Sequence, residues 1–371
     1  MDRSDAGAER SAEVLAAAAI GDAREAGLRY VRADQPGLSR LRAGRAFRYI
    51  DAQGRAVNDA ATLARIRRLA IPPAYQRVWI CADARGHLQA TGYDARGRKQ
   101  YRYHADWRAA RDGSKFARMV EFGERLPRLR RRVARDLKLP ALPRDKVLAT
   151  VVAVLDATRV RIGNDEYARA NRSYGLTTLR NRHVDFIRDG RARFTFRGKG
   201  GAVHDVVLDD RRLSAIVRRC QQLPGQRLFQ YVDDDGAVRA IDSGDVNDYL
   251  RDAMGADFTA KDFRTWGATL SAIARMARTP LPSCERDFKS CIADAVREVA
   301  AELRNTPAVC RKSYINPLVF SAWRDGTLHR LLGNAAPAAT RRAEAAALAF
   351  LRAAARPLPM SRRLRKRATA C

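Results

Sequence analysis

The spacing of apolar residues changes near residue 107, and this change limits the folds open to the chain. Before it, apolar residues occur in short alternating runs between turns, as in RAFRYID at residues 45–51 and KQYRYH at residues 99–104. After it, they recur at helical spacing over most of the remaining length. The pattern predicts an α+β protein with a small strand-rich N-terminal lobe and a larger, mainly α-helical lobe.

The length of 371 residues exceeds that of a typical single domain, so we expect at least two domains. The stretch RAARDGSK, residues 108–115, is predicted to form a hinge between the two lobes. The expected divisions are an N-terminal extension, a strand-rich domain, a mainly helical domain and a basic tail, at residues 1–37, 38–109, 110–355 and 356–371.

The N-terminal lobe is predicted to be a small antiparallel sheet with one helix packed on it. The helix is DAATLARIRRLA, residues 59–70, which ends where two prolines follow at 72 and 73. Besides residues 45–51, the expected strands lie at residues 77–83, 87–94 and 99–104, with turns at residues 84–86 and 96–98.

The second lobe is predicted to begin with a basic helix near residues 115–137, followed by a buried helix that ends at Gly163. A three-stranded meander comes next, with helices from there to the end. Its strands are HVDFI, RARFTF and AVHDVVL, with turns at residues 188–190 and 198–201.

The charge of the chain points to a polyanionic partner. Lysine and arginine number 71 against 41 aspartate and glutamate, a formal net charge of +30 with a pI of about 11.0. Self-repulsion on this scale is typical of proteins that bind nucleic acid. Only nine of these cations are lysines, so a position that remains lysine, such as Lys199, is a candidate for an ammonium that can give up its proton.

Several other classes of protein are not indicated. The six cysteines have no C-x-x-C pair or matching histidine spacing, so neither a zinc site nor a disulfide framework is predicted. The phosphate-binding pattern G-x-x-x-x-G-K-[ST] is absent, and no carboxylate cluster supports metal catalysis. The apolar stretch at residues 14–20 is too short for a membrane span, so we expect a cytoplasmic protein without a metal or another cofactor.

Two predicted helix starts bring charged side chains to positions suited to phosphate. Thr259 is the predicted N-cap, with Asp262 at the capping-box position, which puts Arg264 near the start of a helix. Free N–H groups and a guanidinium there can bind the same anion. Thr306 as N-cap and a proline at the next position begin a short helix that carries Tyr314.

Four motifs in order resemble the catalytic motifs of type IB DNA topoisomerases, in particular the compact poxvirus and bacterial branch. They are VRIGN with Arg161, RGKG with Lys199, KDFRTWG with Arg264, and NTPAVCRKSYINP with Asn305 and Tyr314. GYDARGRKQYRYHADW, residues 92–107, resembles a DNA-contacting segment of that branch, and YGLTTLRNRHV, residues 174–184, resembles the stretch between its first arginine and its lysine hairpin. The resemblance covers roughly residues 38–325.

The resemblance implies a role for each residue. Tyr314 would attack the scissile phosphate and form a 3′-phosphotyrosyl link, while Arg161 and Arg264 would bind the non-bridging oxygens. Lys199 would protonate the leaving 5′-oxygen, and Lys261 would assist near the same phosphate.

Asn305 stands where the poxvirus branch has a histidine, and its amide can still donate a hydrogen bond. The remaining DNA-binding candidates come from the N-terminal lobe and are Gln100, Tyr101, Tyr103, Arg98 and Lys99. The resemblance further implies a clamp around double-stranded DNA. We expect a monomer in the cytoplasm, associated with the nucleoid.

Two alternatives stay open at this stage. Tyrosine recombinases share the Arg, Lys, Arg and Tyr chemistry, but they typically have H-x-x-R where this chain has Lys261 to Arg264, and their N-terminal domain is a helical bundle. A non-catalytic basic DNA-binding protein would explain the charge. It would not explain a tyrosine after Asn-Thr-Pro in register with two arginines and a hairpin lysine.

Overall fold

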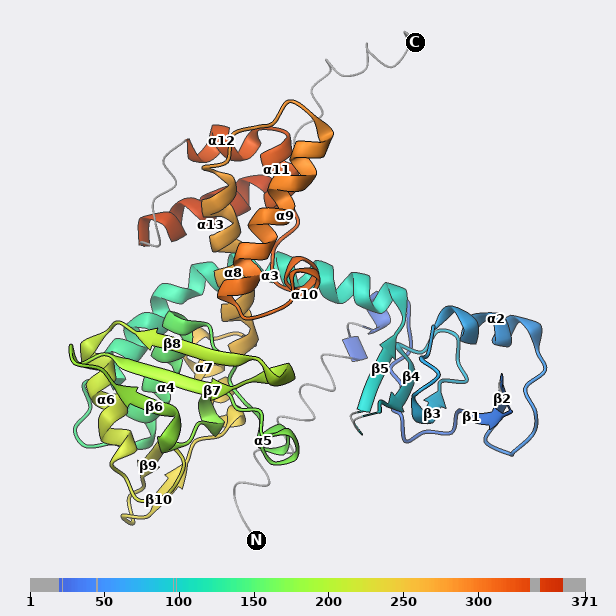
Figure 1. Cartoon of the computed structure of the whole chain (residues 1–371), viewed down its shortest axis with the longest axis horizontal. Helices are drawn as coiled ribbons and strands as arrows, with labels where there is room; N and C mark the ends of the chain where they lie inside the picture. The colour runs from blue at the N-terminus through green and yellow to red at the C-terminus, as the bar shows by residue number, and fades with distance from the viewer. Residues whose placement is uncertain are drawn as a thin grey trace. The chain divides into compact units, whose positions relative to one another are not determined.

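The computed structural model describes residues 20–333 and 341–355, apart from Asp22, Arg45, Arg96 and Arg98 (Figure 1). The chain divides into two compact units between Lys115 and Phe116. The expected basic tail at residues 356–371 and the first 19 residues of the expected N-terminal extension lie outside the described residues.

The first unit contains a five-stranded antiparallel sheet in the order β2-β1-β3-β4-β5. Helix α2 (Ala60–Arg68) begins after Asp59, whose carboxylate accepts a hydrogen bond from the Thr62 N–H at 2.7 Å. The predicted helix and four predicted strands are therefore confirmed, whereas β1 has no counterpart in the prediction. The strands are β1 (Leu38–Ala43), β2 (Ala46–Ile50), β3 (Gln76–Ile80), β4 (Leu88–Tyr93) and β5 (Lys99–Tyr103).

Helix α3 (Ala105–Asp136) continues through residues 108–115, the segment predicted to join the two lobes, and the division between the two units falls at the end of this segment. The segment contains no proline, and a glycine or serine in a helix costs at most about 1 kcal/mol relative to alanine. Such a cost is too small to end a helix whose flanking residues are good helix formers.

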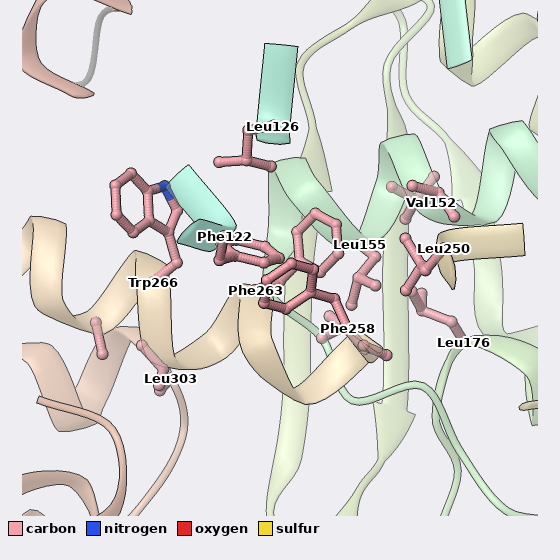
Figure 2. Packing of buried hydrophobic residues seen from close by; sticks show 14 of the residues in the cluster. Phe122, Leu126, Val152, Leu155, Leu176, Leu250, Phe258, Phe263, Trp266 and Leu303 are labelled. Carbon is pink, nitrogen blue, oxygen red and sulfur yellow. The ribbon is translucent and has the colours of Figure 1, made fainter. Parts of the chain in front are cut away.

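The second unit is built around α4 (Arg144–Thr158), which is buried along most of its length (Figure 2). The predicted helix is correct but its predicted end is wrong. It ends at Thr158, because Arg159 takes a left-handed conformation with φ 55° and its N–H closes the last turn on the Leu155 carbonyl. Residues 159–164 therefore form a loop, and Gly163 lies five residues beyond the helix.

Three strands form an antiparallel sheet in the order β6-β7-β8, and this sheet contacts α4 and α6 (Arg211–Gln221). The strands are β6 (Val184–Phe186), β7 (Ala192–Arg197) and β8 (Val203–Leu208). Along β7, Ala192, Phe194 and Phe196 are buried while the residues between them are exposed. A second small hairpin, β9 (Gln230–Val232) and β10 (Val238–Ala240), was not predicted, because three-residue strands are too short to show a period.

The C-terminal part of this unit is helical, with α8 (Ala260–Met276) in contact with α4, α7, α9, α11 and α13. Arg130 of α3 joins Asp156 of α4 to Glu344 of α13 through hydrogen-bonded ion pairs. The remaining helices are α5 (Asp165–Asn171), α7 (Ser243–Met254), α9 (Glu285–Glu302), α10 (Pro307–Ser313), α11 (Leu318–Arg324), α12 (Thr327–Leu332) and α13 (Arg341–Ala355).

Gly123 of α3 lies against Trp266 of α8, a residue of the core cluster in Figure 2. A Cβ atom at Gly123 would lie 2.6 Å from the indole ring and 3.0 Å from Leu348. Gly123→Ala should therefore destabilise the protein by about 1–3 kcal/mol, although the same change in an open helix usually stabilises it. Chemical denaturation measures this difference, and an unchanged or raised stability would contradict the packing described.

Candidate active site

Tyr314 is placed by α10 and α8. Thr306 is the N-cap of α10, its hydroxyl accepts a hydrogen bond from the Val309 N–H at 3.3 Å, and Pro307 is the first helical residue, as predicted. Tyr314 directly follows the helix instead of lying within it. The Thr269 hydroxyl of α8 donates to the Tyr314 carbonyl at 3.2 Å and accepts from the Asn316 N–H at 3.1 Å. One α8 side chain thus holds the backbone on both sides of the tyrosine.

Arg264 is the fifth residue of α8 and is only 3% exposed. Its guanidinium donates to the carbonyl of Leu303 at 2.9 Å and to the carbonyl of Arg159, and it lies 5.1 Å from the centre of the Tyr314 ring. Among the described residues, no carboxylate forms an ion pair with it. The N-terminus of α8 matches the prediction, with Thr259 as N-cap and its N–H donating to the Asp262 carboxylate at 2.8 Å.

Arg161 lies in the loop after α4, and the segment from Gly175 holds that loop. The Leu176 N–H donates to the Arg161 carbonyl at 2.9 Å, and the Thr177 N–H donates to the Ile162 carbonyl at 2.7 Å. A Cβ atom at Gly175 would lie 2.5 Å from the Arg161 carbonyl oxygen, so the close approach requires glycine.

Among the buried side-chain nitrogens that have no hydrogen-bond partner within the described residues are Nη1 of Arg161, Nε of Arg264 and Nδ2 of Asn305, which lie on separate segments. The Asn305 amide oxygen is already occupied, since it accepts from the Thr306 N–H at 3.1 Å. Buried donors without an acceptor are uncommon and costly. The segments that carry Arg161 and Asn305 both contain a carbonyl that accepts from Arg264. An anion bound beside the tyrosine could supply acceptors for these donors.

Positive charge also acts on the Tyr314 hydroxyl. Burial opposes its ionisation, but the charges of Arg264, Arg161 and Lys261 outweigh burial and hold the pKa of Tyr314 below its ordinary value. Lys261 itself is exposed in the first turn of α8. The arrangement favours the oxyanion that a phosphoryl-transfer nucleophile requires.

Lys199 is exposed in the turn between β7 and β8. Within the described part of the chain, its ammonium makes no hydrogen bond or ion pair. The structure therefore brings together Arg161, Arg264 and Tyr314, with Lys261 nearby. Asn305 lies two residues after Leu303, whose carbonyl accepts from Arg264, whereas the ammonium of Lys199 is not part of this group.

Comparisons with known proteins find matches along most of the chain. The model of the eukaryotic DNA topoisomerase I catalytic core matches residues 104–319, and that of the bacterial DNA topoisomerase IB N-terminal domain matches residues 46–94. DNA topoisomerase 1B of Acanthamoeba polyphaga mimivirus is 34% identical over 287 residues, which are 75% of this chain and 85% of that protein. The chain belongs to the type IB DNA topoisomerase family.

DNA topoisomerase 1B of vaccinia virus is more distant, at 22% identity over 262 residues, covering 68% of this chain and 76% of the viral protein. The family resemblance predicted from the motifs is confirmed, and the recombinase alternative is not favoured. The residues matched by the catalytic-core model include the segments that carry Arg161, Lys199, Arg264 and Tyr314.

Sequence reasoning missed several residues that shape the active site of this topoisomerase. Gly267 gives room to Arg159, because a Cβ atom there would lie 2.1 Å from the arginine Nε. Arg304, in a left-handed conformation with φ 48°, donates to the Asp205 carbonyl on β8. Gly267 belongs to the KDFRTWG motif, which was a usable signal, but nothing in the local sequence distinguishes Arg159 or Arg304 from other arginines.

His204 of β8 was also missed, since the five histidines show no ligand spacing. It is 3% exposed, and its buried Nδ1 has no hydrogen-bond partner among the residues that the structure describes. Burial first, then the charges of Arg304, Arg161 and Arg264, lower the pKa of His204 to about 4. A neutral imidazole therefore lies beside the arginine cluster.

The predicted DNA contacts of the N-terminal unit divide between the two faces of β5. Lys99, Tyr101 and Tyr103 are exposed on one face, where the two tyrosine rings stack at 6.2 Å. Gln100 is half-buried on the other face and donates to Asp94 at 2.9 Å. Arg98 lies outside the described residues.

The described residues contain no group of three or more His, Cys, Asp or Glu side chains that could hold a metal ion. None of the described helices has the length and apolar character needed to cross a bilayer.

The stability of this topoisomerase should decrease on mild acidification because two buried histidines are held neutral. Burial and nearby arginines lower the pKa values of His183 and His204 from 6.5 to about 4. The unfolded chain therefore binds more protons between pH 6.5 and 4, and each histidine should remove about 2 kcal/mol of stability between pH 7 and 5. Urea denaturation at several pH values measures this loss.

His183→Gln is the matched variant, because its amide oxygen can still accept the hydrogen bond that His183 Nδ1 accepts from the Arg180 N–H at 3.0 Å. This variant should lose less stability than the wild type on acidification. An identical pH dependence would show that His183 does not contribute.

Proposed function

We propose that this type IB topoisomerase relaxes supercoiled duplex DNA by cutting one strand through a 3′-phosphotyrosyl link at Tyr314 and then resealing it. The observation that carries the proposal is the half-buried Tyr314 against Arg264, together with buried donors on Arg161, Arg264 and Asn305 that have no partner among the described residues. A phosphodiester offers two non-bridging oxygens that can accept from them.

In the proposed step, the Tyr314 hydroxyl gives up its proton to water and its oxygen forms a bond to phosphorus, while the bond from phosphorus to the 5′-oxygen breaks. Arg161, Arg264 and Asn305 bind the negative charge that develops on the non-bridging oxygens. Arg264 is already desolvated and fixed by two carbonyls, so it needs little rearrangement when that charge appears. Lys261 supports the same phosphate with its charge.

We assign the general acid to Lys199. A 5′-alkoxide is a poor leaving group unless it takes up a proton, and an ammonium can supply it. Gly200 and Gly201 follow the lysine with φ 75° and 83°, and open space surrounds Gly200, so this turn can change its conformation when DNA binds. Resealing reverses each step, returning the proton to Lys199.

The phosphotyrosyl bond conserves the energy of the broken phosphodiester, so the cycle requires neither ATP nor a metal ion. We propose that the strand-rich unit, residues 38–109, contacts DNA with Lys99, Tyr101 and Tyr103, aided by Arg98 and Gln100. It would complete a clamp with the catalytic unit, residues 110–355. The protein would act as a monomer on nucleoid DNA in the cytoplasm.

The first test is relaxation of a supercoiled plasmid in EDTA without nucleotide, where both positive and negative supercoils should be removed. Tyr314→Phe should abolish relaxation and the covalent DNA adduct while DNA affinity stays nearly unchanged, because the ring and its surrounding cations remain. Gel electrophoresis follows the topoisomers, and denaturing gels detect the protein-linked 3′ end. An absolute need for a metal or ATP, or an adduct formed by Tyr314→Phe, would refute the proposal.

The role of Lys199 can be isolated with a substrate whose bridging 5′-oxygen is replaced by sulfur, because a thiolate leaves without a proton. Lys199→Ala should slow cleavage of the oxygen substrate by ~10²–10⁴-fold and cut the sulfur substrate at close to the wild-type rate. Arg264→Ala, which lacks a phosphate contact, should remain slow on both substrates. Equal defects of Lys199→Ala on the two substrates would mean that Lys199 only positions the phosphate.

A further inference from the structure

The imidazole of His204 forms part of the base of the turn that carries Lys199. Phe196 of β7 and His204 of β8 are direct partners in the antiparallel sheet, and their rings stack with centres 4.7 Å apart and planes 11° apart. Both side chains are buried. The ring of His204 is therefore fixed in position by its cross-strand partner.

The same ring is in close contact with the turn. A Cβ atom at Gly198 would lie 2.5 Å from His204 Nε2 and 2.6 Å from Cδ2, so Gly198 packs its backbone directly on the imidazole. Gly198 is buried and immediately precedes Lys199, which is exposed. The turn is thus supported at its first residue by one side chain and is open at its tip.

His204 also connects this turn to the phosphate-binding residues. Arg161, Arg264 and Arg304 are near enough for their charges to act on its imidazole. At the next position along β8, the Asp205 carbonyl accepts a hydrogen bond from Arg304, the residue before Asn305. Strand β8, which follows the lysine turn, is therefore hydrogen-bonded to the segment that carries Asn305.

We propose that His204 is a positioning residue for Lys199, whose ring sets the distance between the lysine turn and the phosphate site of Arg161 and Arg264. The inference rests on the acid role of Lys199 proposed above. Without the ring, the backbone at Gly198 loses its support, and the ammonium spends less time within reach of the leaving 5′-oxygen. The phosphate-binding residues themselves keep their backbone contacts.

The experiment measures single-turnover cleavage by His204→Ala on the oxygen and sulfur substrates. We expect a loss of about 10–10²-fold on the oxygen substrate, part of the full contribution of a general acid, and a rate within about threefold of wild type on the sulfur substrate. Added to Lys199→Ala, His204→Ala should slow the oxygen reaction by no more than about threefold further, because both changes remove the same proton transfer.

Gly198→Ala gives a second measurement that does not depend on removing a buried ring. Its methyl group would collide with the His204 ring, so this variant should reproduce the defect on oxygen and the recovery on sulfur. His329→Gln is the control, because His329 is a histidine of the same unit that lies on α12 and hydrogen-bonds to the Thr279 carbonyl instead of packing on Phe196 or Gly198. It should cleave both substrates at close to the wild-type rate.

Equal defects of His204→Ala or Gly198→Ala on the two substrates, while Lys199→Ala still recovers on sulfur, would overturn the inference alone. They would show that the ring supports the arginine pocket instead of the lysine. Wild-type cleavage of the oxygen substrate by His204→Ala would also overturn it. Equal defects of Lys199→Ala itself would remove the acid role, and both proposals would fall together.

Discussion

The candidate active site depends on two hydrogen bonds that the buried Arg264 guanidinium donates to backbone carbonyls. The guanidinium donates to the carbonyl of Arg159 at the end of α4 and to the carbonyl of Leu303 at the end of α9. Helix ends leave such carbonyls without intrahelical partners, and a cation is favourable there. One side chain therefore holds the ends of two helices together, and its guanidinium lies over the Tyr314 ring.

This arrangement leaves the site with more positive charge than the described residues neutralise. Burial first, and then the charge of Arg161, lower the pKa of the Arg264 guanidinium, whose Nε has no acceptor among the described residues. Such a cluster is costly in the free protein and is relieved by an anion. The free-energy cost of burying cations without acceptors is thus concentrated where a phosphate would bind. The apolar core around α4 and α8 supports this site (Figure 2).

Sequence patterns predicted the secondary structure well where local chemistry decides it. Proline at 307 and threonine at 306 set the start of α10, and the apolar run of residues 147–155 predicted α4. Predictions failed where competing local signals were weak. Gly163 was a reasonable end for α4, yet Arg159 ends it with a left-handed conformation that its contacts with α8 and α9 favour.

The sequence by itself determined the family of the protein and predicted its chemistry, because motif order, residue type and net charge are properties of the chain that need no coordinates. It identified the nucleophile, two arginines, the amide and the lysine as candidates. Only the tertiary structure decided how they are supported, since Arg159, His204 and Arg304 act through contacts between segments distant in sequence. Such contacts produce no periodic pattern and no capping residue in the neighbouring sequence, because their free energy arises only when the segments pack together.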